Sequence, residues 1–266
     1  MTCAASDSGG GAGIQADLKA FAAMGVYGFC AISAVTAQNS HAVTRLECVS
    51  PETFRAQLDA VADDFRVDAV KVGLLGNPAN TAALAGFLES RLPRVPAVVD
   101  PVMVSAAGHV FLDSPSLEAL ALLLRRAYLA TPNVPEAERL SGVEIRSPDD
   151  AARAAERILA SGPRNVLVKG GHGGGDVSED VLMGEDGSAR FSLPRRESGF
   201  THGTGCTLSS AIAALLARGR PLADAVGEAK EYVWQAMDPD CAPDLGGAGP
   251  GPLNHFCRWY RFAGRT

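Results

Sequence analysis

Short apolar segments and longer amphipathic segments alternate along almost the whole chain. The apolar segments, at residues 29–36, 69–75, 97–104, 127–130 and 165–169, predict β-strands, and several are apolar on both faces. The amphipathic segments, at residues 12–24, 51–65, 80–91, 114–125, 148–160, 204–217 and 222–237, predict helices. Pro51, Pro148 and Pro221 stand at predicted first helical turns, where proline is tolerated. The pattern predicts an α/β fold with a mostly parallel central sheet covered by helices on both faces.

The order of these segments also predicts where a functional site lies. No long linker, internal repeat or charge block interrupts the alternation, so we expect one domain over residues 1–266. Open parallel sheets bind ligands beyond the carboxyl ends of their strands. Asp100, Asn133, Lys169 and the turn at residues 201–206 all end or follow apolar segments. We therefore expect these residues to lie at one edge of the sheet.

Composition and charge narrow the class of protein. Apolar residues make up 47% of the 266 residues, which supports a large core and argues against disorder. The net charge of −6 argues against non-specific binding to nucleic acids or anionic membranes, because such binding depends on a basic surface. We expect neither nucleic acid nor membrane to be a partner.

Three further features predict a cytoplasmic protein. The first residues, MTCAASDSGGG, contain neither the basic nor the apolar region of a secretory signal. The longest uncharged run, residues 199–217, opens with a polar turn and predicts a loop followed by a buried helix rather than a membrane span. The six cysteines form no CxxC pair and no zinc-binding spacing, which predicts free thiols.

The turn THGTGC at residues 201–206 leads directly into an apolar helix. Gly203 and Gly205 allow close approach of a ligand to the backbone, and the helix start offers free N–H groups and a positive dipole end. With Thr204 these residues predict an anion hole suited to a phosphoryl group in transfer. The same dipole predicts a lowered pKa for the Cys206 thiol, which makes it a candidate proton acceptor or nucleophile. The alternative is an ordinary turn with a small buried cysteine.

A second glycine cluster, DSGGGAGIQADLK, covers residues 7–19. It contains no GxGxxG in register, and Gly-Lys-Ser/Thr occurs nowhere in the chain, which excludes a P-loop and disfavours a dinucleotide site. Successive glycines before a helix provide room for a small substrate against the backbone. A flexible turn after a short first strand is the alternative.

Four polar residues after predicted strands suit phosphate and metal chemistry. Asp100 ends an apolar strand, and its carboxylate would cap a loop or hold Mg²⁺. Asn133 and Glu136 provide oxygen ligands for Mg²⁺, or alternatively the cap and first turn of a helix. Lys169 precedes a glycine loop and could contact nucleotide phosphates, or simply extend its charge into solvent. His172 is more readily interpreted as a loop residue than as a contact.

The motifs together resemble the hydroxymethylpyrimidine/phosphomethylpyrimidine kinases of thiamin biosynthesis, within the ribokinase-like superfamily. The matching stretches are SDSGGGAGIQADLKAF, AVTAQNS, VKVGLL, VVDPVM, TPNVPEA, VLVKGGH, THGTGCTLSSAIAA and GPGPLNHF. They run from about Ala4 to Trp259. The resemblance implies a ribokinase-like three-layer α/β/α sandwich, with ATP- and Mg²⁺-dependent phosphorylation first of a hydroxymethylpyrimidine and then of its monophosphate.

The resemblance also implies a role for each candidate residue. Cys206 would deprotonate the attacking oxygen, and the turn Gly203–Cys206 would form the anion hole. The implied nucleotide contacts are Lys169, Asn133 and Thr204, and the implied Mg²⁺ residues are Asp100 and Glu136. The implied substrate-binding residues are Gln38, Ala12, Leu74 and Asp17. An amide such as Gln38 can donate and accept at once, which suits an amino group beside a ring nitrogen.

The chain departs from the family pattern at several positions. The first strand is short, Ala5 stands where glycine is common, and GFTHG replaces Asn-Thr-His-Gly before the anion hole. The loop Ser105–His109 lacks a lysine often found there, which bears on lid or phosphate contacts. None of these departures removes a proposed catalytic group.

Two alternatives to the pyrimidine kinase stay open on the sequence alone. A pyridoxal or pyridoxine kinase of the same superfamily would share most of the motifs. A non-catalytic pyrimidine-binding regulatory protein would keep the fold without turnover, although intact Asp100, Glu136, Lys169 and Gly203–Cys206 argue against it. A homodimer is expected, since dimers are common among the relatives.

Overall fold

A single nine-stranded sheet runs through the molecule. The computed structural model describes residues 1–103, 114–172, 175–243 and 245–260. The strands are β1 (Thr2–Asp7), β2 (Cys30–Gln38), β3 (Val43–Cys48), β4 (Val70–Val72), β5 (Ala97–Val99), β6 (Leu129–Ala130), β7 (Asn165–Val168), β8 (Val177–Gly184) and β9 (Gly187–Pro194). Their order in the sheet is β3-β2-β1-β4-β5-β6-β7-β8-β9. The strands from β2 to β7 in this order pair in parallel, whereas β3 at one edge and β8 and β9 at the other are antiparallel.

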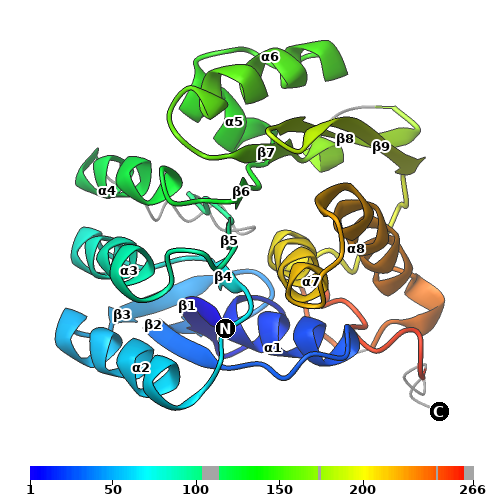
Figure 1. Cartoon of the computed structure of the whole chain (residues 1–266). Helices are drawn as coiled ribbons and strands as arrows, with labels where there is room; N and C mark the ends of the chain where they lie inside the picture. Colours follow the sequence, from blue (N-terminus) through cyan, green and yellow to red (C-terminus); the bar gives the residue numbers. More distant parts are fainter. Residues whose placement is uncertain (104–113, 173–174, 244, 261–266) are drawn as a thin grey trace.

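Helices cover both faces of the sheet (Figure 1). They are α1 (Gly13–Ala23), α2 (Pro51–Asp64), α3 (Pro78–Arg91), α4 (Ser114–Leu124), α5 (Val134–Ser141), α6 (Pro148–Leu159), α7 (Thr204–Ala217) and α8 (Leu222–Ala236). Short 3₁₀ turns, η1 (Gly170–His172) and η2 (Pro239–Cys241), follow β7 and α8. The helices α2 to α6 pack on one face, and α1, α7 and α8 pack on the other. The predicted three-layer sandwich with a mostly parallel sheet is confirmed.

The two apolar layers follow from the alternation of side chains along each strand. Val98 and Val99 are adjacent in β5 and fully or almost fully buried, but they belong to opposite cores. Val99 contributes to the core that includes Phe54 of α2. Val98 contributes to the core that includes Tyr232 of α8. A strand covered on both faces must be apolar at successive positions, which explains the continuous apolar segments of the sequence.

Helix starts follow the sequence closely. Ser50, Asn77 and Ser147 cap α2, α3 and α6, and each side chain accepts a hydrogen bond from a backbone N–H of the first turn. A proline follows each of these caps. The prediction for Pro221 is wrong by one position, because it is the N-cap residue of α8 and precedes the first turn.

Several elements differ from the sequence prediction. The strands β3, β8 and β9 were absent from it, and the helix α5 was given only as the alternative interpretation of Asn133 and Glu136. The strand β5 ends at Val99, shortly before Pro101, which cannot donate to a ladder, so the predicted strand was too long. The hairpin of β8 and β9 turns through Glu185 and Asp186, just before Gly187.

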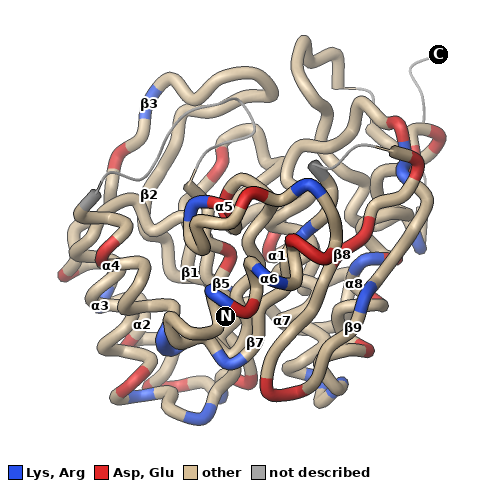
Figure 2. The backbone as a smooth tube through the Cα atoms, turned by 90° about the horizontal axis from the view of Figure 1, so that it is seen from above, with Lys and Arg blue, Asp and Glu red and all other residues tan. Residues whose placement is uncertain are grey.

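The described part of the chain holds no helix that combines the length and apolar character needed to cross a bilayer. Seen from above, residues of both charge signs are interspersed around the described backbone (Figure 2). All six cysteines lie in the described part and are free thiols, as predicted.

Candidate active site

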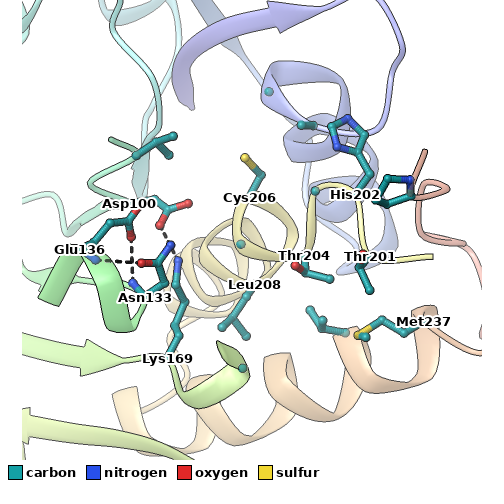
Figure 3. Close-up of a pocket in the computed structure, with 18 of the residues that line it drawn as sticks. Asp100, Asn133, Glu136, Lys169, Thr201, His202, Thr204, Cys206, Leu208 and Met237 are labelled. Carbon is teal, nitrogen blue, oxygen red and sulfur yellow. Dashed lines mark hydrogen bonds and ion pairs between the residues drawn. The ribbon is translucent and has the colours of Figure 1, made fainter. Parts of the chain in front are cut away.

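A cavity of about 810 Å³ opens at the carboxyl ends of the parallel strands, a volume in the usual range for small-molecule sites. Its lining includes eleven of the residues predicted from the sequence: Ala12, Gln38, Leu74, Asp100, Asn133, Glu136, Lys169, Gly203, Thr204, Gly205 and Cys206. The close-up in Figure 3 shows Cys206 between the Asp100–Lys169 group on one side and Thr204 with Met237 on the other. The loop Ser105–His109 and the side chain of His172 lie outside what the structure describes.

The glycine-rich loop after β1 is organised by the carboxylate of Asp7. The Asp7 side chain accepts hydrogen bonds from the N–H groups of Gly9, Gly11 and Ala12 at 2.8–3.1 Å. His202, from the loop before α7, lies 3.0 Å from the same carboxylate. Burial acts to raise the pKa of Asp7, but the bonds from His202, Ala12 and Gly9 outweigh it and the pKa is lowered. Asp7 therefore links the two glycine-bearing loops, a role that sequence reasoning missed although both residues lie in its motifs.

The helix α7 starts directly under the cavity. Gly203 is its N-cap residue with φ of 88°, and a Cβ there would lie 1.8 Å from the carbonyl oxygen of Gly11. Only glycine fits this crossing of two loops. The N–H groups of the first turn, including those of Gly205 and Cys206, lack partners within the helix and surround the cavity floor. This geometry can hold an anion, as the sequence predicted.

The expectation that the helix start lowers the pKa of the Cys206 thiol is wrong. Burial raises the pKa of the thiol. The ammonium of Lys71 and the hydrogen bond from the Gly13 N–H act to lower the pKa, whereas the carboxylates of Asp17 and Asp100 act to raise it further. Burial removes the thiolate from water, and this cost exceeds the local effect of the helix dipole. Cys206 still faces the cavity, since it is only partly covered and belongs to the lining.

The acidic side of the cavity joins the ends of β5, β6 and β7. Lys169 Nζ lies 2.7 Å from Asp100 Oδ1, and both side chains are largely buried. The backbone N–H of Asn133 donates to Glu136 Oε2 at 2.8 Å, and the Asn133 side chain accepts from the Glu136 N–H at 2.9 Å. This is a capping box, so the helix-start interpretation of these two residues is correct, yet both also line the cavity.

Burial and two neighbouring charges act on the pKa of Glu136. Burial raises its pKa to about 7; the charge of Lys169 acts against this and that of Asp100 adds to it. Burial also acts to lower the pKa of Lys169, but Asp100 and Glu136 outweigh it and the pKa is raised. Two carboxylates thus share one ammonium group. The arrangement favours an additional cation beside them.

The other side of the cavity is formed by the ends of β1, β2 and β4. Gln38 ends β2, and its Oε1 accepts a hydrogen bond from Thr36 Oγ1 at 3.2 Å. Ala12 and Leu74 line the same region, as expected. Asp17 does not line the cavity: its side chain is fully buried beneath it and bonded to Lys71. The implied direct contact of Asp17 with substrate therefore has no support from its position.

Sequence reasoning also missed an apolar end of the cavity. Its side chains come from β9, α7 and α8: Leu193, Pro194, Leu208, Val233, Trp234 and Met237. Near it, Lys230 Nζ lies 2.9 Å from Asp180 Oδ2. Apart from Leu208, which lies in the stretch THGTGCTLSSAIAA, these residues belong to no motif, and β9 itself was not predicted. The apolar end lies beside the anion hole, so the cavity can hold a flat ring and a phosphate chain together.

Comparison with known proteins identifies the family. The family model described as "Phosphomethylpyrimidine kinase" matches residues 7–254. A hydroxymethylpyrimidine/phosphomethylpyrimidine kinase of Rhizobium meliloti (strain 1021) is 46% identical over 263 residues, which is 98% of each chain.

Two solved structures are similar in fold and sequence. Phosphomethylpyrimidine kinase from Clostridium difficile 630 has a TM-score of 0.79 at 40% identity, covering 89% of this chain and 98% of its own. Pyridoxal kinase from Bacillus subtilis, in an ADP complex, has a TM-score of 0.86 at 33% identity, covering 97% and 96%. Given the family match over nearly the full length, the chain belongs to the phosphomethylpyrimidine kinase family.

Proposed function

We propose that this enzyme transfers the γ-phosphoryl group of ATP to 4-amino-5-hydroxymethyl-2-methylpyrimidine, and then to the resulting monophosphate, in thiamin biosynthesis. The observation that carries the proposal is the meeting of Gln38, the Gly203–Cys206 turn and the Lys169–Asp100 pair in one cavity. Each of these groups has a distinct task in such a reaction, and together they span the substrate, the transferred group and the nucleotide.

Gln38 supports the choice of an aminopyrimidine. Its amide offers one acceptor and two donors, while an aminopyrimidine edge offers a donor next to a ring acceptor. The Gln38 Oε1 atom is already oriented by Thr36 Oγ1. Ala12 and Leu74 add apolar contact area for the ring. A substrate held by Gln38 would direct its hydroxymethyl group towards Cys206.

The reaction itself is phosphoryl transfer between two bound substrates. The substrate oxygen attacks the γ-phosphorus, a new O–P bond forms, and the bond to the β-phosphate oxygen breaks so that ADP leaves. In the first step the hydroxyl proton passes to Cys206 Sγ. The N–H groups at the start of α7 stabilise the charge on the transferred group. Lys169, Asn133 and Thr204 contact the nucleotide phosphates, and the apolar end of the cavity receives the base.

The acidic side of the cavity fits Mg²⁺. Asp100 and Glu136 supply carboxylate oxygens, and the cavity leaves room for the water ligands that Mg²⁺ retains. The raised pKa of Glu136 fits the same conclusion, since a bound cation would relieve the excess negative charge. When bound there, Mg²⁺ neutralises charge on the nucleotide phosphates.

The proposal is tested by product analysis. The purified protein is incubated with Mg-ATP and, in separate reactions, with hydroxymethylpyrimidine, its monophosphate or pyridoxal, and products are identified by mass spectrometry. We expect a monophosphate and then a diphosphate from the pyrimidine, and a diphosphate from the monophosphate. Phosphate on pyridoxal alone would transfer the assignment to the pyridoxal kinases that resemble this chain in fold. Ligand binding without any product would favour a regulatory protein.

The homodimer and the cytoplasmic location expected from the sequence remain predictions. Sedimentation of the purified protein decides the first, because a dimer has twice the 27.5 kDa of the single chain.

A further inference from the structure

A buried ion pair lies beneath the reacting end of the cavity and has no part in the reaction described above. Lys71 of β4 and Asp17 of α1 are both fully buried. Lys71 Nζ lies 2.9 Å from Asp17 Oδ1 and 3.0 Å from Asp17 Oδ2, so the ammonium bridges both carboxylate oxygens. Such a pair is costly to bury, and replacing it with apolar residues of similar size often stabilises a protein. Its presence therefore calls for a reason other than stability.

The carboxylate of Asp17 is fully occupied by donors. Thr2 Oγ1 of β1 donates to Oδ2 at 2.6 Å, and Ser210 Oγ of α7 donates to Oδ1 at 2.7 Å. Ser210 lies four residues after Cys206, one helical turn further along α7. The pair therefore joins four elements directly below the cysteine.

Lys71 differs from Asp17 because it also reaches the cavity. Lys71 is a lining residue, whereas Asp17 is not. A Cβ at Gly73 would lie 2.8 Å from Lys71 Nζ, so the neighbouring backbone confines the ammonium group as well. Lys71 thus lies at the buried floor of the cavity, and Asp17 lies behind it.

Four charged groups act on the Cys206 sulfur. Lys71 of β4 and Lys169 at the end of β7 are positive, and Asp17 of α1 and Asp100 at the end of β5 are negative. Lys169 is engaged by Asp100 at 2.7 Å, and Asp17 shares its charge among three donors. After burial, Lys71 is the largest influence on the thiol, and it favours the thiolate form.

We propose that the Asp17–Lys71 pair is a positioning device for proton removal: it fixes an ammonium group beside Cys206 so that the sulfur can accept the proton of a hydroxyl nucleophile. This inference rests on the proposed function and deepens it, because it separates the requirements of the two phosphorylations. Lys71 is a positioning residue here, since it acts on the substrate through Cys206.

The two reactions differ in whether a proton must leave. In the first, an alcohol O–H bond breaks, the proton passes to the Cys206 thiolate, and the oxygen forms its bond to the γ-phosphorus as ADP departs. In the second, the nucleophile is an oxygen of the substrate's phosphate, which is largely ionised near neutral pH and has no proton to lose. Loss of the fixed charge should therefore impair the first reaction much more than the second.

The test replaces the pair with neutral side chains of similar shape, Asp17→Asn together with Lys71→Met. Changing both at once avoids an unpaired buried charge, which a single substitution would leave. With saturating Mg-ATP, initial rates are measured for hydroxymethylpyrimidine and, separately, for its monophosphate. We expect the first rate to fall roughly tenfold to a hundredfold more than the second, the range for a weakened general base. Cys206→Ala should show the same selectivity in stronger form.

A second readout is independent of turnover. Iodoacetamide labelling of Cys206, located by peptide mass mapping, is followed against pH in both proteins. We expect half-maximal labelling to move to higher pH in the double variant, because the influence of Lys71 that favours the thiolate is larger than the opposing influence of Asp17, which is lost with it. Thermal unfolding of each protein shows that the fold is retained.

The matched control is another buried ion pair, changed as Asp180→Asn together with Lys230→Met. It lies at the apolar end of the cavity and should alter both reactions to a similar extent, without moving the labelling curve. Equal loss of both reactions in the Asp17/Lys71 variant, or an unchanged labelling curve, would overturn the inference. If the unaltered protein formed neither product, the proposed function would be wrong, while the labelling curve would still decide whether Lys71 acts on Cys206.

Discussion

At the residue scale, the site depends on two glycine-bearing loops that touch each other. Gly203 has a positive φ and lies against the Gly11 carbonyl, while Asp7 and His202 bond across the same junction. The N–H groups of the anion hole keep their direction only if this junction stays closed. The residues THGTGC predicted the anion hole, but the partner that closes it, residues 7–12, could be found only in three dimensions.

Gly203→Ala should therefore disable catalysis. The added Cβ would meet Gly11 O at 1.8 Å and must shift the turn, so we expect turnover to fall by roughly a hundredfold or more. Strain should also lower the free energy of unfolding by about 1–3 kcal/mol. The measurements are the initial rate with hydroxymethylpyrimidine and urea unfolding of the purified variant.

Gly219→Ala is the control for this change. Gly219 also has a positive φ, but a Cβ there has open space around it and the residue lies outside the cavity lining. The control should lose about 1 kcal/mol of stability and keep its turnover. Similar turnover in the two variants would mean that the Gly203–Gly11 contact is unimportant for the anion hole.

Residue chemistry was predictable where it is local and less so where it depends on packing. For Asn133 and Glu136 the sequence left two alternatives, oxygen ligands for Mg²⁺ or the start of a helix, and the structure contains the helix start as a complete capping box. The pKa of Cys206 was predicted in the wrong direction, because the helix dipole can be inferred from sequence while the burial that raises the pKa cannot. Asp17 was assigned to the substrate because its burial could not be inferred from the sequence either.

At the element scale, the C-terminal segment stabilises the start of α7. His202 N–H donates to Gly251 O at 3.0 Å, and His255 Nε2 lies 3.0 Å from Thr207 Oγ1. Tyr232 of α8 donates its hydroxyl to His255 O at 2.8 Å. His255 is almost fully buried; burial, with a smaller contribution from the charge of Lys19, lowers its pKa to about 4.

This histidine should make stability depend on pH. Its pKa in the folded state is about 4, below the ordinary value of 6.5. Between pH 4 and pH 6.5 the unfolded state therefore binds a proton that the folded state does not bind. Stability is complete above pH 6.5 and falls as pH decreases towards 4, by about 3 kcal/mol from this group. His255→Gln should remove most of that slope in urea unfolding measured at several pH values.

The exposed His41 provides the comparison, as His41→Gln. This variant should keep the pH slope of the unaltered protein. If His255→Gln also kept it, His255 would not be the neutral buried group inferred from its contacts.

Elements with strong periodicity were predicted well, and those at the sheet edges were not. The central strands are buried on both faces and read as continuous apolar segments, so their existence followed from the sequence. The edge hairpin of β8 and β9 carries charges such as Glu179 and Arg190 and lacks such a run. The residues Glu185-Asp186-Gly187 were a usable turn signal for it. Because the hairpin of β8 and β9 was not predicted, the apolar end of the cavity was missed.

At the scale of the whole molecule, the active site joins parts of nearly the whole chain. Residues from β1 through α8 line the cavity, and the two cores meet along one continuous sheet. We propose that the chain folds as a single domain, which has the consequence that both cores melt together. Tryptophan fluorescence, from Trp234 and Trp259, and far-ultraviolet circular dichroism should then give coincident unfolding transitions. Two separated transitions would contradict a single domain.

The most direct test of the account is a competition between the two candidate rings in one reaction. The protein is given equal concentrations of hydroxymethylpyrimidine and pyridoxal with limiting Mg-ATP, and products are followed over time by mass spectrometry. The account predicts that pyrimidine monophosphate forms first and is converted to the diphosphate, with pyridoxal phosphate a minor product. Predominant pyridoxal phosphate, or pyrimidine monophosphate that never proceeds to the diphosphate, would contradict it.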